Sequence, residues 1–228
     1  LQTPGAMPQV QQPPVANWTE KMTRRVETVE HGEKLVKMVE HDVLRPLPVV
    51  ASSIETVLRL DPRQKGLLWY STYGVDFAAT YVIANTSGAT RDVQIALPFP
   101  ASNAVFDDLQ FELEGRPWAA LPAPANNQIA GRVRLEAGES VTLRAGYRSQ
   151  GLDRWTYGFG HGVAEVRDFT MTVKTNFAAI DFPDGSISPA HKERSGEGWI
   201  LRWEFRRLVS GVNIAIVMPE KLQPGPLA

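Results

Sequence analysis

An alternation of apolar and polar residues runs through most of the chain after residue 54. In one stretch Val75, Phe77 and Ala79 are followed at the same spacing by Tyr81 and Ile83, with smaller or polar residues between them. A period of two is typical of a strand that buries one face. The same alternation recurs at residues 93–97, 106–113, 133–145, 163–173, 199–205 and 212–216.

Turn residues separate these stretches at intervals of roughly ten residues. The run from Asn85 to Gly88 follows the first stretch, and Pro98 and Pro100 follow the next. Because asparagine, glycine and proline favour turns, and many short strands joined by turns form sandwiches, the predicted fold class is mainly β. We expect two consecutive β-sandwich-like halves, preceded by a short helical or irregular N-terminal segment.

The N-terminal segment, residues 18–48, has a different pattern. Met22, Val26 and Val29 recur near the spacing of three to four residues that marks an amphipathic helix face. We therefore expect a helix that packs on the β region, with a partner-docking or membrane-proximal helix as the alternative. Strands are a third possibility, because valine, threonine and glutamate alternate over residues 25–30.

Proline and glutamine dominate the beginning of the chain and predict an extended, poorly ordered stretch there. The predicted organisation therefore has four parts. They are a disordered Pro/Gln-rich arm (1–17), an N-terminal segment with possible helix (18–48), a first β-sandwich-like half (49–147) and a second β-sandwich-like half (148–228).

An internal similarity supports the division into halves. Residues 63–70 and residues 148–157 share the pattern Arg-x-x-Gly-Leu followed by aromatic residues. A second pattern, Leu-x-x-Gly-x-x-aliphatic-x-aliphatic, occurs at 135–143 and again at 208–216. Both a duplication and the convergence of turn chemistry in two β regions explain such a similarity.

Composition excludes several classes of function. The 228 residues are 43% hydrophobic and 21% charged, which is ordinary for a chain that buries a core. The net charge of −1 gives no basic surface for a nucleic-acid partner. The chain has no cysteine, which excludes disulfides, thiolate metal sites and cysteine nucleophiles but leaves the compartment open.

Motifs for catalysis and for cofactors are missing from the sequence. The four histidines form no His-x-His or His-Glu-x-x-His pattern, and no Gly-x-Ser-x-Gly or phosphate-binding loop occurs. The sequence therefore predicts no enzyme, no metal site and no cofactor. A hydrolase remains an alternative, and it requires Asp107, Asp181 or His161 to converge in one pocket.

Aromatic residues provide the candidate binding site. They cluster in the two similar stretches, and rings with a polar group are favoured at interfaces and on sugar-binding surfaces. The alternative is that these rings fill the core. We expect a functional surface where the two stretches meet. The candidate residues are Trp69, Tyr70, Tyr73, Trp155, Tyr157 and Phe159.

A family resemblance rests on the run from Arg63 to Tyr70, on Phe77 and Tyr81, and on the run from Trp199 to Trp203. Over residues 50–218 this arrangement resembles the periplasmic part of CreD-like bacterial inner-membrane proteins. The resemblance implies a non-enzymatic binding, sensing or structural module on the periplasmic face of the inner membrane. Its partner would be an unknown protein or glycan.

The membrane tether of such a protein is expected outside these residues, since no run approaches the about 20 apolar residues of a membrane helix. The alternative is a secreted protein. In that case the chain would be a carbohydrate-binding or accessory β-sandwich domain of a polysaccharide-active protein.

Overall fold

The computed structural model confirms the mainly β fold class. Every regular element in the described part of the chain is a strand. None of these residues belongs to a helix that could span a bilayer. The structure describes residues 7–30, 33–114, 116–117, 126–160, 162 and 164–220.

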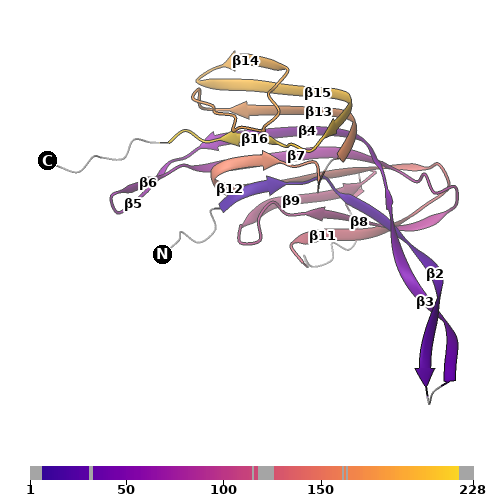
Figure 1. The fold of residues 1–228 in the computed structure, drawn as a ribbon. Coiled ribbons are helices and arrows are strands. Elements are labelled where there is room, and N and C mark those ends of the chain that lie inside the picture. Colours follow the sequence, from indigo (N-terminus) through magenta and orange to yellow (C-terminus); the bar gives the residue numbers. More distant parts are fainter. Residues whose placement is uncertain are drawn as a thin grey trace.

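The largest sheet has ten strands, and eight of them follow the order β10-β9-β12-β7-β4-β13-β15-β14. The other two, β1 (Met7–Gln11) and β16 (Ile214–Val217), pair with β12 (Figure 1). The remaining strands are β4 (Val49–Leu60), β7 (Thr72–Ala84), β9 (Phe106–Leu113), β10 (Arg116–Pro117), β12 (Ser140–Tyr157), β13 (Ala164–Thr175), β14 (His191–Ser195) and β15 (Gly198–Ser210).

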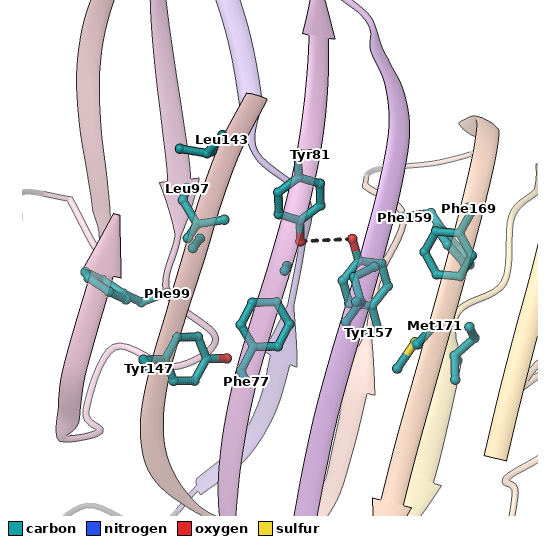
Figure 2. Close-up of a cluster of buried hydrophobic side chains, with 14 of the residues drawn as sticks. Phe77, Tyr81, Leu97, Phe99, Leu143, Tyr147, Tyr157, Phe159, Phe169 and Met171 are labelled. Carbon is teal, nitrogen blue, oxygen red and sulfur yellow. Dashed lines mark hydrogen bonds between the residues drawn. The ribbon is translucent and has the colours of Figure 1, made fainter. Parts of the chain in front are cut away.

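A second sheet has the order β11-β8-β2-β3, and a small hairpin, β5-β6, forms a third. The side chains of Val93, Ile95 and Leu97 from β8 are buried together with apolar residues of the ten-stranded sheet. Figure 2 shows Leu97 beside Leu143, with Phe77 and Tyr81 nearby. The strands are β2 (Val15–Glu30), β3 (Glu33–Leu47), β5 (Arg63–Lys65), β6 (Leu68–Tyr70), β8 (Arg91–Pro98) and β11 (Gln128–Leu135).

The strand β12 has two sets of neighbours. Its residues Ser140 to Leu152 pair with β7, whereas its last residues pair with β1 on one side and with β16 on the other. The strand runs without a break through residues 147 and 148, where the sequence places the boundary between halves. One cluster of buried apolar residues spans both sides of that boundary.

The beginning of the chain is ordered where a disordered arm is predicted. Met7–Gln11 forms β1, which runs parallel to β12, and residues 1–6 lie outside the described residues. The amide of Gln9 donates to Ser149 Oγ at 2.9 Å, and Tyr147 donates to Gln11 Oε1 at 2.7 Å. The buried amide nitrogens of both glutamines donate to partners within the chain, which offsets part of the cost of burial, whereas Oε1 of Gln9 has no partner among the described residues.

The predicted helix over residues 18–48 is wrong, and the strand alternative is correct. β2 and β3 form one long antiparallel hairpin in which Val26 lies opposite Lys37. Beyond Trp18 and Leu47 the hairpin leaves the body, and we name residues 19–46 the projecting hairpin (Figure 1). The threonines and valines of β2 are β-branched, which lowers helix propensity and favours a pleated strand.

One buried side chain holds the turn after β7. The amide nitrogen of Asn85 donates to the carbonyl oxygens of Ala89, Leu135 and Glu136 at 2.8–3.0 Å. Its Oδ1 accepts from the backbone N–H and the hydroxyl of Ser87. The turn signal at Asn85 in the sequence therefore corresponds to a side chain that ties β7 to the end of β11.

We expect the substitution Asn85→Ala to lower the free energy of unfolding by about 2–3 kcal/mol, because it leaves buried carbonyl groups without a donor. Urea unfolding followed by tryptophan fluorescence measures the change. Ser87→Ala is the matched control and should cost about 1 kcal/mol, since it removes only hydroxyl contacts. Equal losses for the two variants would contradict this account of the turn.

Candidate functional site

Four of the six predicted binding residues lie in the core. Tyr73, Trp155 and Tyr157 are at most 1% exposed, and Phe159 is 8% exposed. Figure 2 shows Tyr157 and Phe159 among other buried rings, with the hydroxyl of Tyr157 directed at that of Tyr81, 3.2 Å away. Rings in this position stabilise the sandwich and do not form an exposed row.

Tyr73 follows the first aromatic stretch, at the start of β7, and β7 pairs with the second stretch on β12. Tyr73 lies opposite Gly151, and its hydroxyl donates to the carbonyl oxygen of Arg154 at 2.7 Å. A Cβ atom on Gly151 would stand 2.1 Å from Cζ of Tyr73. The glycine shared by the two stretches is therefore required at this position because the Tyr73 ring covers it.

The two stretches that are similar in sequence form different strand arrangements. Residues 63–70 form the small β5-β6 hairpin, whereas residues 148–157 lie within the single strand β12. Trp69 and Tyr70 are on β6 and are half-buried. They are the two predicted rings that keep substantial contact with solvent.

A pocket of about 460 Å³ opens beside Tyr157 and Phe159. Phe169 forms part of its lining, with its ring centroid 5.2 Å from that of Phe159. Ser52 and Arg167 add polar groups to the lining. The volume and the mixture of apolar and polar groups are those of small-molecule sites.

An ion-pair network occupies the rim of this pocket. Glu165 Oε1 accepts from Nε of Arg167 at 3.2 Å and from Nε of Arg207 at 2.7 Å. The hydrogen bond from Arg167, and a further one from Arg207, hold the pKa of the Glu165 carboxyl below its usual range. The carboxylate is thus engaged by two guanidinium groups.

Structural contacts are described for two of the three hydrolase candidates, Asp107 and Asp181. Asp107 and Asp108 both contact Nη2 of Arg148, at 3.0 and 2.7 Å. The backbone carbonyl of Asp181 accepts from the N–H of Val217, and His161 lies outside the described residues. Within the described ranges, no group of three or more His, Asp or Glu side chains is placed to hold a metal ion.

The projecting hairpin exposes many large apolar side chains. Met38 is 65% exposed and Leu44 is 64% exposed. On β2, Arg25 lies opposite Met38 and Thr19 lies opposite Leu44. Both faces of the hairpin mix apolar with charged positions, and its described side chains between Thr19 and Pro46 are all exposed or half-buried. The exposed apolar residues are Met22, Val29, Leu35, Val36, Met38, Val39 and Leu44.

The outer edge of β3 is the second unusual feature of the hairpin. β3 is the last strand of its sheet and, in the described part of the chain, pairs with β2 alone. The edge strand β14 of the large sheet is different, because Lys192, Glu193 and Arg194 are all charged and exposed. Charged edges resist pairing with other chains, and the edge of β3 differs in that exposed apolar side chains alternate with its charges.

No protein-family model and no curated protein matches this sequence. Solved structures with a similar chain trace exist. One is the crystal structure of a "putative nutrient binding protein" from Legionella pneumophila, with a TM-score of 0.49 and 11% sequence identity. The similarity covers 75% of this chain and 68% of that chain, and it transfers no function.

Proposed function

We propose that this chain is a non-enzymatic binding module of the bacterial cell envelope, and that it binds a protein partner along the outer edge of β3. The observation that carries the proposal is the projecting hairpin, with seven large apolar side chains exposed in its described part. Several large apolar side chains exposed on one element are typical of interaction sites. The proposed location is the periplasmic face of an inner membrane, and the CreD-like arrangement of residues 50–218 supports it.

The energetics of an isolated hairpin support binding at this edge. A two-stranded hairpin is marginally stable in water, and a third strand or a packed layer is needed for independent stability. From Thr19 to Pro46 the projecting hairpin has neither within the described residues. A partner strand added to β3 would supply backbone hydrogen bonds and cover apolar side chains at the same time.

The glycan-binding alternative has less support. It depends on an exposed row of rings, and four of the six candidates, Tyr73 and Trp155 among them, are in the core. Trp69 and Tyr70 remain as half-buried rings on β6. Affinity electrophoresis in polysaccharide gels tests this alternative, and retardation that Trp69→Ala abolishes would favour it over the protein partner.

Site-specific photo-cross-linking in the native cell tests the proposal. A photoreactive residue at position 38 should give discrete adducts of protein size, because Met38 lies at the middle of the proposed edge. The control places the same residue at Val209, which is equally exposed (63%) but lies on β15 in the body. Equal adducts from the two positions, or none from position 38, would overturn the proposal.

A shortened variant supplies the second control. Residues 21–42 are replaced by Asn-Gly, which makes a tight turn between Glu20 and Val43, a pair that lies opposite in the hairpin. Because Trp18 and Leu47 stay in the core, we expect the midpoint of urea unfolding to change little. Partner binding should be lost, and retention of binding by the shortened variant would contradict the proposal.

A further inference from the structure

We propose that the partner of the projecting hairpin is a second copy of this chain, and that two β3 strands pair antiparallel about a two-fold axis at Met38. The inference rests on the proposed function, since it names the partner of the same edge. A two-fold axis makes the same surface patch self-complementary, as in most homodimers. The paired hairpins would form a four-stranded sheet with the order β2-β3-β3-β2.

Charge along β3 selects this register. In antiparallel pairing, residues at equal distances from the axis lie opposite each other and on the same face. With Met38 at the axis, Lys34 of each copy lies opposite Asp42 of the other, and Glu40 is its diagonal neighbour. Lys34, Asp42 and Glu40 are all exposed, so each is available to the second copy. The dimer then holds two symmetric sets of opposite charges.

Neighbouring registers are less favourable. An axis at Lys37 pairs Lys34 with Glu40, but it also puts two lysines directly opposite each other at the centre. An axis at Glu40 puts two glutamates opposite. Like charges directly opposite destabilise a strand pair. An axis at Val39 places Lys34 opposite Leu44 and Asp42 opposite Val36, so the two Lys34–Asp42 pairs are lost. An axis at Met38 places Lys37 opposite Val39 and Glu40 opposite Val36, but it keeps both Lys34–Asp42 pairs and puts no like charges directly opposite each other.

Apolar contacts also form across the shared edge in this register. The two Met38 side chains lie opposite each other, and Val36 lies next to them on the same face. On the other face, Leu35 and Val39 of the two copies become diagonal neighbours. These residues are among the exposed apolar side chains of the hairpin, so pairing shields part of their surface from water.

Cysteine cross-linking tests the register, because the natural chain has no cysteine. Met38→Cys should give a covalent dimer with a short bismaleimide, since opposite residues have Cβ atoms about 5 Å apart. Leu44→Cys is the matched control, with 64% exposure against 65% for Met38. Two copies of residue 44 would be twelve residues apart along the strands, about 40 Å at roughly 3.3 Å per residue, and should not cross-link.

Charge reversal tests the pairing by sedimentation equilibrium. Lys34→Glu and Asp42→Lys each place like charges opposite in a homodimer, so each variant alone should dimerise about tenfold more weakly than the natural chain. An equimolar mixture restores both lysine–aspartate-type pairs in a heterodimer and should regain the natural affinity. Lys21 lies opposite Asp42 within the same hairpin, so Asp42→Lys also changes a contact inside one chain. That change is still present in the mixture, so recovery of affinity there can come only from the pairs between chains.

The outcomes separate this inference from the proposed function. A natural chain that stays monomeric over its whole soluble range, or a mixture that is no tighter than its components, overturns the self-pairing. Adducts of Met38 with a different protein would then leave the proposed function standing. If the monomer instead floats with phosphatidylglycerol vesicles, and the shortened variant does not, the hairpin binds a lipid surface and both proposals are wrong.

Discussion

Replacing Trp155 by alanine is expected to lower the free energy of unfolding by about 4 kcal/mol. Trp155 is fully buried on β12, opposite Gln9 of β1 on one side and Ile216 of β16 on the other. Its indole Nε1 has no hydrogen-bond partner among the described residues, so apolar packing is what the substitution removes. Urea unfolding followed by circular dichroism measures the change.

The matched control for this prediction is Trp69→Ala. Trp69 is half-buried on β6 and belongs to the other aromatic stretch. Its removal should cost about 1 kcal/mol or less, which is typical of positions outside the core. If Trp155→Ala left the unfolding midpoint unchanged, the assignment of this ring to the core would be wrong and a binding role would be restored.

Alkaline unfolding is the second large effect that we expect. Burial raises the pKa of Tyr73, Tyr81, Tyr147 and Tyr157 above the ordinary value near 10. These are four of the five tyrosines in the chain. Below pH 10 both folded and unfolded states keep the phenol protons, so the groups have no effect on stability. Above pH 10 the unfolded chain loses protons that the folded chain keeps, and stability falls.

The magnitude follows from proton linkage. Each group contributes a slope of about 1.4 kcal/mol per pH unit, so the four together lower the free energy of unfolding by about 5–6 kcal/mol at pH 11. That is comparable to the whole stability of many domains, about 5–15 kcal/mol. Urea unfolding at a series of pH values from neutral to 11 measures the slope.

The variant Tyr81→Phe provides the control for the alkaline slope. It removes one phenol and keeps the ring in place, so the slope above pH 10 should fall by about a quarter. Phenolate absorbance should appear for these tyrosines together with unfolding. Ionisation of all of them at pH 10 in a chain that stays folded would contradict their burial.

The local part of the fold could be predicted from the sequence. Alternation over residues 75–83 correctly indicates β7, because period-two burial is a property of neighbouring residues. The sequence predicts a helix over the hairpin because Met22, Val26 and Val29 recur near a helical spacing. In β2 these side chains divide between the two faces, with Met22 and Val26 on one face and Val29 on the other. Apolar residues on both faces of a strand leave no clear alternation in the sequence.

The candidate site depended on contacts that the sequence does not specify. Alternation shows that a ring is half-buried, but it does not show which face is covered. Tyr73 is buried because β7 pairs with β12 at Gly151, and Trp155 is buried because β1 and β16 flank it. The exposed edge of β3 could not be predicted for the same reason. The alternation of valine, threonine and glutamate over residues 25–30 indicates the neighbouring strand β2 but not which edge of the hairpin is open.

The pairing of β1 with β12 also determines the order in which the chain can fold during synthesis. Gln9 reaches its partner Ser149 across 140 residues of sequence. At a synthesis rate of about 5–20 residues per second, β1 waits on the order of ten seconds for its neighbour. The β2-β3 hairpin is local and closes within about 1–10 μs of emerging. The two strands that carry the proposed surface can therefore pair long before the body that supports them is complete.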